Sequence, residues 1–298
     1  MGDGVAAEEI AYHDVTPEGA RASRDFSVFT WLNLVCLDAP LVAVSWQWLF
    51  AQSFEIPVAR GGTAALFLTA WLIYLADRFG DSLSVNERGP LSLRQRFCRR
   101  HRSAWIGSVI GIALVDLVVI AQLDGVTMRA GARVGVCAVL YLVLNQRWPS
   151  LWRRLPLKEI SIGFLFAAGT RVGLAAGLTG SALPGWFLFA CLCALNCVSI
   201  AVWERELDRA QGRISIATIF PNLERYLLLV LFALTASALG FPGNGTQAVA
   251  VWIAGSALLL AGLHFFRNDI APDVRTALAD LVLLTPVAAL IARALFAG

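Results

Sequence analysis

The stretch WLIYLADRFGDS, residues 71–82, decides the fold, because an apolar run suited to hydrocarbon ends there in two acidic residues. Asp77 and Asp81 are four residues apart, with Arg78 between them. Residues at positions i and i+4 share one face of a helix. The stretch therefore predicts a membrane helix that presents two neighbouring carboxylates where it leaves the membrane.

The composition of the whole chain agrees with a membrane location. Of 298 residues, 58% are hydrophobic and only 15% are charged, and the mean hydropathy is +0.67. These values lie outside the range of soluble globular domains. The net charge of +3 is too small to indicate a nucleic-acid partner. The six cysteines and three histidines lack the spacing of a zinc site.

A helix needs about 20 mostly apolar residues to span a bilayer. Nine runs of this kind lie at 28–52, 58–77, 104–123, 129–146, 158–178, 182–203, 224–241, 246–266 and 274–296. We therefore expect an all-α, polytopic helical bundle with nine transmembrane helices over residues 28–298. The polar, acid-rich residues 1–27 are expected to form a cytoplasmic tail.

The arginines and lysine of the loops indicate the orientation. Basic residues gather after the second, fourth, sixth and eighth runs, whereas the loops between them hold almost none. Cytoplasmic loops carry such an excess. The pattern predicts a cytoplasmic N-terminus and, with an odd number of spans, an outer C-terminus, in a bacterial inner membrane.

A second acidic pair follows the sixth run, in NCVSIAVWERELDRAQGRISIAT (196–218). Glu204 and Asp208 are again four residues apart, on the same predicted side as Asp77 and Asp81. Two carboxylates about 6 Å apart repel each other by roughly 1 to 3 kcal/mol at an effective dielectric near 20. Oxygen ligands without His or Cys favour Mg²⁺, which often shares its coordination with phosphates. The two pairs predict a Mg²⁺ and diphosphate site, although a solvated, salt-bridged helix end would also explain each pair alone.

At these residues the chain resembles the UbiA superfamily of intramembrane prenyltransferases, which have nine transmembrane helices and two Asp-rich motifs. Residues 73–81 resemble the first motif, N-D-x-x-D-x-x-x-D, with Ile73 and Tyr74 in place of its Asn and first Asp. Residues 204–215 resemble the second, D-x-x-x-D-x-x-x-G-x-x-[ST], with Glu204 in place of its first Asp. LDAP (37–40) is similar to the L-D-R-P of the first span.

The resemblance implies Mg²⁺-dependent transfer of a prenyl group from a polyprenyl diphosphate to a hydrophobic, often aromatic, acceptor in the membrane. The expected catalytic and metal-binding residues are Asp77, Asp81, Glu204 and Asp208. The expected substrate-binding residues are Arg147, Lys158, Arg209, Tyr74 and Asp38. For Tyr74, anchoring at the membrane interface is an alternative role to shielding a carbocation.

Other functions remain open at this point. The missing Asn and Asp favour a non-catalytic protein that binds a prenyl lipid or quinone. A CDP-alcohol phosphatidyltransferase would carry D-x-x-D-G-x-x-A-R, which is absent from the sequence. A transporter would place its polar site near the midplane. Asp116 and Arg171 lie within predicted spans, where ionisable groups usually pair or line a cavity.

The orientation can be tested by cysteine labelling in intact and opened membrane vesicles. Single cysteines in the loops around 78–103 and 204–223 should react only from the cytoplasmic side, because the basic bias recurs at every second loop. A cysteine in the loop at 242–246 should react only from the opposite side. Labelling of that loop from the cytoplasm would contradict the predicted topology.

Overall fold

The structure is a computed structural model that describes residues 28–85, 89–174, 180–241 and 244–296. The predicted tail at 1–27 lies outside these residues. The described chain is helical throughout, with no strand and one isolated bridge between Val58 and Leu174. The predicted all-α class is therefore confirmed.

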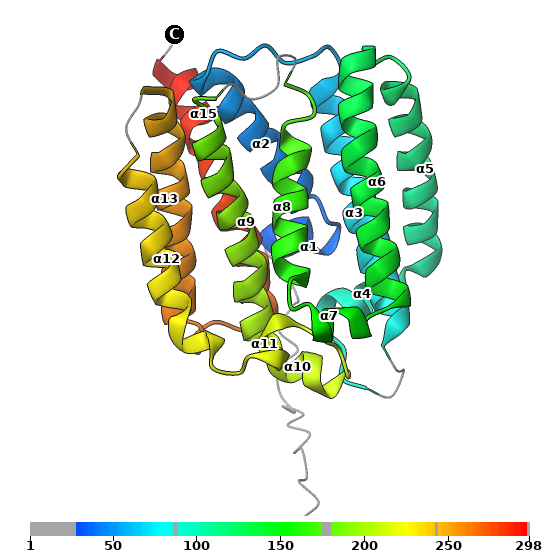
Figure 1. The fold of residues 1–298 in the computed structure, drawn as a ribbon. Coiled ribbons are helices and arrows are strands. Elements are labelled where there is room, and N and C mark those ends of the chain that lie inside the picture. The colour runs from blue at the N-terminus through cyan, green and yellow to red at the C-terminus, as the bar shows by residue number, and fades with distance from the viewer. Residues whose placement is uncertain (1–27, 86–88, 175–179, 242–243, 297–298) are drawn as a thin grey trace, which may run out of the picture.

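The helices follow the order of the predicted apolar runs (Figure 1). The long helices are α2 (Asp38–Ser53), α3 (Gly62–Ser84), α5 (Arg102–Ile120), α6 (Gly125–Arg147), α8 (Lys158–Thr170), α9 (Leu183–Trp203), α12 (Leu223–Leu239), α13 (Asn244–Phe265) and α15 (Thr285–Phe296). The shorter ones are α1 (Val28–Leu34), α4 (Leu93–Arg100), α7 (Ser150–Arg154), α10 (Arg205–Ala210), α11 (Ile216–Ile219), α14 (Pro272–Leu281) and the 3₁₀ turn η1 (Val282–Leu284).

Five helical segments are long and apolar enough to cross a membrane. They lie at 102–120, 125–147, 183–203, 246–265 and 272–291. This number supports an integral membrane protein. The other predicted runs also contain helix, but the first is divided after α1 and the fifth ends at Thr170. Cys36, with a φ of 58°, lies in the break between α1 and α2.

Aromatic packing joins the central helices. The Trp46 ring of α2 stacks on Phe189 of α9 with the centroids 4.3 Å apart. The Trp46 indole N–H donates to the Leu283 carbonyl oxygen at 2.8 Å, so it is satisfied inside the core. Large aromatic side chains contribute much of the apolar area that a core buries. These contacts hold α2, α9 and the break between α14 and α15 together.

In contrast, α5 and α6 expose large apolar side chains at one edge of the bundle (Figure 1). Leu114 and Val118 of α5 and Val136 and Leu140 of α6 are all more than half exposed. A contiguous apolar surface of this kind is unfavourable in water but suits contact with lipid tails. These two helices therefore present the outer, lipid-facing side of the molecule.

The short helices with basic residues gather at one end of the bundle. Figure 1 shows α4, α7 and α10 at that end and the C-terminus at the other. They follow α3, α6 and α9, which correspond to the predicted second, fourth and sixth spans. The basic segments that follow the second, fourth and sixth predicted spans therefore lie at the same end of the bundle, as predicted.

Close packing of α8 on α9 depends on Gly163. A Cβ atom at this position would collide with the backbone N and Cα atoms of Ala194, which cannot move aside as a side chain can. Small residues allow such close approach of membrane helices. Gly163→Ala should therefore destabilise the protein by about 1 to 3 kcal/mol, the usual effect of overpacking.

Thermal unfolding in detergent would measure this effect. Gly111→Ala in α5 is the matched control, because a Cβ atom there meets nothing within 4 Å. Equal melting temperatures for the two variants would show that α8 and α9 can move apart to accommodate the added methyl group without loss of stability.

Candidate functional site

The first acidic pair lies near the C-terminal end of α3. Asp77 and Asp81 are one helical turn apart, as predicted. Asp81 forms an ion pair with the guanidinium of Arg213. Asp77 lines an apolar cavity, and its Oδ1 is buried with no hydrogen-bond partner among the described residues. The two carboxylates therefore have different environments.

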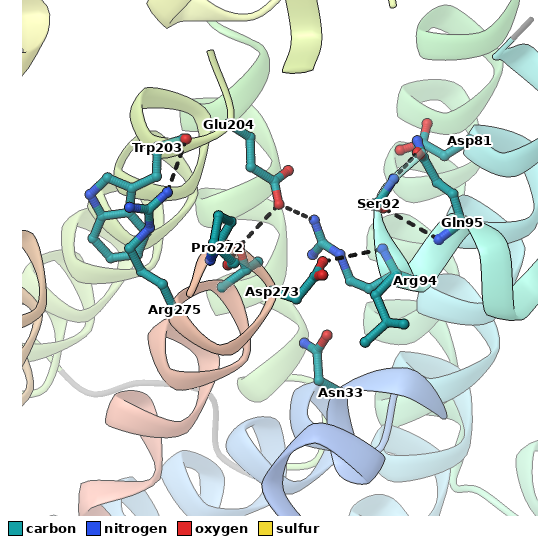
Figure 2. Close-up of polar contacts among 12 residues, drawn as sticks. Asn33, Asp81, Ser92, Arg94, Gln95, Trp203, Glu204, Pro272, Asp273 and Arg275 are labelled. Carbon is teal, nitrogen blue, oxygen red and sulfur yellow. Dashed lines mark hydrogen bonds and ion pairs between the residues drawn. The ribbon is translucent and has the colours of Figure 1, made fainter. Parts of the chain in front are cut away.

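The second pair lies where α9 gives way to α10. Glu204 stands at the junction, and its carboxylate binds the guanidinium of Arg94 and accepts a hydrogen bond from the Thr276 hydroxyl at 3.0 Å. Figure 2 shows Glu204 between Arg94 and α14. Asp208 follows one turn later on α10. Glu204 is thus held by a cation and a hydroxyl from two other helices.

Local structure places Arg94 at this point. A capping box formed by Ser92 and Gln95 begins α4, in which Arg94 is the second residue. The Leu93 N–H donates to Asp273 Oδ1 at 3.2 Å, which fastens the start of α4 to α14 (Figure 2). The guanidinium is therefore presented to Glu204 by a well-anchored helix end.

Arg213 connects the two acidic pairs. Gly212 has a φ of 67°, which favours glycine, and lets the chain turn back after α10. The Arg213 N–H donates to the Asp208 carbonyl oxygen at 2.8 Å while its side chain reaches Asp81. Burial lowers the pKa of Arg213, but the charges of Asp81 and Asp208 outweigh burial and raise it overall.

Asp208 faces the same cations. Burial raises its pKa, and the charges of Arg213 and Lys158 only partly oppose this effect. Lys158, the first residue of α8, also interacts electrostatically with Asp77. The structure therefore brings residues of both acidic pairs together around Arg213 and Lys158, at the end of the bundle that carries the basic loops.

Arg209 and Arg147, which the sequence predicted to contact diphosphate, lie on the surface of the protein. Arg209 is exposed and pairs with Glu206, with 2.8 Å between Nη1 and Oε1. Arg147 is an exposed residue at the end of α6, on the border of a groove that also includes Phe79 and Gly80. Sequence spacing placed both at the correct end of their helices, but it could not indicate the direction of a long side chain.

Tyr74 and Asp38 occupy different sites. Tyr74 lies one turn before Asp77, lines the same cavity and packs edge-to-face on Phe166. Asp38 is only 1% exposed and accepts a hydrogen bond from the Asn33 amide at 2.6 Å. The same amide nitrogen lies 3.2 Å from an oxygen of Asp280. Asp38 therefore belongs to a buried polar network beside the break between α1 and α2.

The apolar cavity has a volume of about 340 Å³ and lies among α3, α5, α6 and α8. Asp77 and Tyr141 line it towards the charged end of the bundle, and Leu123 and Met128 line it near the turn between α5 and α6. Its other walls are almost entirely hydrocarbon. A chain-like apolar molecule would suit this space.

Several residues of the site were not singled out by the sequence. Arg94 and Arg213 look like ordinary loop arginines, and nothing in their spacing distinguishes them. Asp280 and Asn196, joined by a hydrogen bond of 3.0 Å, had a visible signal because both are polar residues inside apolar runs. The partners of the acidic residues became apparent only in the folded structure.

The part of the chain that the structure describes contains no group of three or more His, Cys, Asp or Glu side chains that could hold a metal ion. Two of the four carboxylates are held in ion pairs, Asp81 with Arg213 and Glu204 with Arg94.

Comparisons with known family models, curated proteins and solved structures found no match. The fold and site by themselves define an all-helical membrane protein with a charged cluster at one end of an apolar cavity.

The pairing of Asp81 with Arg213 predicts the outcome of a charge exchange. Asp81→Arg and Arg213→Asp should each lower the melting temperature, because each places two like charges together. The double variant should recover stability, with a coupling energy of about 1 to 3 kcal/mol between the two positions.

The exposed pair of Glu206 and Arg209 is the control for this cycle. Its side chains are 72% and 43% exposed, so its coupling should stay below about 1 kcal/mol. Strictly additive effects at Asp81 and Arg213 would mean that the two side chains do not interact.

Proposed function

We propose that the protein transfers a prenyl group from a polyprenyl diphosphate to a hydrophobic acceptor within the membrane. The observation that carries this proposal is the apolar cavity with Asp77 and Tyr74 in its wall near the charged cluster. A prenyl chain would fill the cavity, and its diphosphate would lie among the charged side chains. An amphiphile with a long apolar tail and a multiply charged head matches an apolar cavity that ends at a charged cluster.

The cations of the cluster would bind the diphosphate. Lys158 faces both acidic pairs, and Arg213 faces them from the turn after α10. Arginine binds phosphate oxygens with a planar fork of donors, whereas lysine acts as a point charge. In this proposal Arg213 takes the role that the sequence suggested for Arg209. A diphosphate would compete with Asp81 for the Arg213 guanidinium.

Magnesium would bind to the carboxylates of this site after they release their arginine partners. The unpartnered Oδ1 of Asp77 suits a hard cation directly. Asp81, Glu204 and Asp208 would complete the oxygen ligands once the diphosphate draws the arginines away. When bound, Mg²⁺ would supply stabilisation of the negative charge on the leaving diphosphate.

The reaction in this proposal begins with cleavage of the allylic C–O bond, and the diphosphate leaves with the electron pair. Arg213 and Lys158 would stabilise the charge that develops on it. The acceptor carbon would then bond to the allylic cation, and its proton would pass to the departed diphosphate. The Tyr74 ring, near Asp77 and packed on Phe166, would face the cationic carbon.

A second candidate is a non-catalytic protein that binds a prenyl lipid or quinone. The ion pairs at Asp81 and Glu204 favour it, because these two carboxylates have cationic partners without a metal ion. Both candidates use the same cavity. We also propose nine spans with a cytoplasmic N-terminus, which would place the charged cluster at the cytoplasmic surface.

Diphosphate release from allylic prenyl diphosphates, measured with purified protein in lipid, tests the proposal. Release should require Mg²⁺ and rise with an acceptor. Asp77→Asn should lower the rate about a hundredfold to a thousandfold, since loss of one transition-state contact costs about 2.7 to 4 kcal/mol. Its fold should survive, because a neutral amide replaces a buried charge of the same shape.

Glu206→Gln is the matched control, because Glu206 is an exposed acid on α10 that pairs with Arg205 and Arg209. It should leave the rate unchanged. A wild-type protein that retains prenyl lipids but turns over no donor of about five to fifty carbons would support the non-catalytic candidate.

A further inference from the structure

Asp116 is a buried carboxyl group that the proposed reaction does not use. It lies in the second half of α5, is 3% exposed and lines the apolar cavity. Its Oδ2 accepts a hydrogen bond from the Thr69 hydroxyl of α3 at 2.8 Å. Its Oδ1 has no hydrogen-bond partner among the residues that the structure describes.

An unpartnered carboxyl oxygen in hydrocarbon is costly, and buried polar atoms in native proteins are nearly always hydrogen-bonded. A purely structural link between α5 and α3 would need only the oxygen that binds Thr69. The cavity wall around Asp116 includes apolar residues such as Leu66, Ile120 and Met128, and the described lining contains no Lys, Arg or His. A molecule inside the cavity would supply a partner for Oδ1.

The position of Asp116 sets where that molecule is polar. Thr69 and Asp77 are eight residues apart on α3, which corresponds to about 12 Å along the helix axis. The contact with Thr69 therefore places Asp116 about two helical turns from the charged end of the cavity. The cavity has a second polar point within its apolar length.

We infer that the cavity binds a lipid alcohol, whose hydroxyl group forms a hydrogen bond with Asp116. A hydroxyl can donate to a carboxylate or accept from a carboxylic acid, so it satisfies Asp116 in either protonation state. A ketone would satisfy only the acid, and an ammonium group would bring a charge into hydrocarbon. A neutral alcohol on an apolar chain is the chemistry that fits both the carboxyl and the walls.

This site goes beyond the proposed transfer reaction and needs neither Mg²⁺ nor diphosphate. The alcohol and a prenyl tail would share the same walls, so they should compete for the cavity. Binding of the alcohol can therefore be measured without turnover. Failure of the transfer reaction would leave the alcohol site intact, and turnover without alcohol selectivity would remove only the alcohol site.

The test compares farnesol with the hydrocarbon farnesene as probes, with purified protein in lipid nanodiscs and without metal. The hydrocarbon keeps the apolar chain but has no oxygen, so it can neither donate a hydrogen bond to Asp116 nor accept one from it. Wild type should bind farnesol about tenfold more tightly, the effect of one hydrogen bond in a buried site. Asp116→Leu should bind the two probes equally, because it keeps a similar shape without polar atoms.

Val118→Leu is the matched control, since Val118 lies on the same helix, is exposed and does not line the cavity, so this variant should keep the tenfold preference. Asp116→Asn retains a polar group and should keep part of the preference, which covers the case of poor folding of the leucine variant. Equal binding of both probes by wild type, or binding of neither, would overturn the inference. So would an unchanged preference in a folded Asp116→Leu protein.

Discussion

Charged groups at the ends of apolar helices need partners, and the ion pair of Asp81 with Arg213 meets this requirement for α3. Repulsion between Asp77 and Asp81 and between Glu204 and Asp208 would otherwise oppose burial of either pair. Arg213 faces both pairs, and Arg94 secures Glu204 from α4. The turn after α10, which carries Arg213, and α4, which carries Arg94, are both joined to the acidic pairs by this neutralisation.

The same neutralisation shapes what the site can do. Arginines pair with two of the four carboxylates, and a multiply charged anion could compete with these carboxylates for the arginines. The unpartnered Asp77 Oδ1 then marks the point where the charged cluster meets the hydrocarbon cavity. The proposed transfer reaction thus requires the arginines to exchange their carboxylate partners for the diphosphate. The non-catalytic candidate requires only that the ion pairs remain in place.

Polar atoms inside the bundle fall into two groups with different consequences. Asp38, Asn33, Asp280 and Asn196 are linked by hydrogen bonds, and this network stabilises the break beside α1. Asp116 shares only one of its oxygens with Thr69. The network lies within the packed helices and accounts for architecture, although Asn196 Oδ1 has no hydrogen-bond partner among the described residues. The unpartnered oxygen of Asp116 differs because Asp116 lines a cavity that a ligand could fill.

The sequence by itself determined the helical class, the membrane character and the positions of the two acidic pairs, because apolar run length and i,i+4 spacing are local properties. It also indicated that alternate basic loops share one end. Only the tertiary structure decided that Arg94 and Arg213 neutralise Glu204 and Asp81, that Arg209 turns to Glu206, and that Asp116 meets Thr69 beside a cavity. The direction of a long side chain and the partner of a buried oxygen depend on packing between helices far apart in the chain, which no local pattern records.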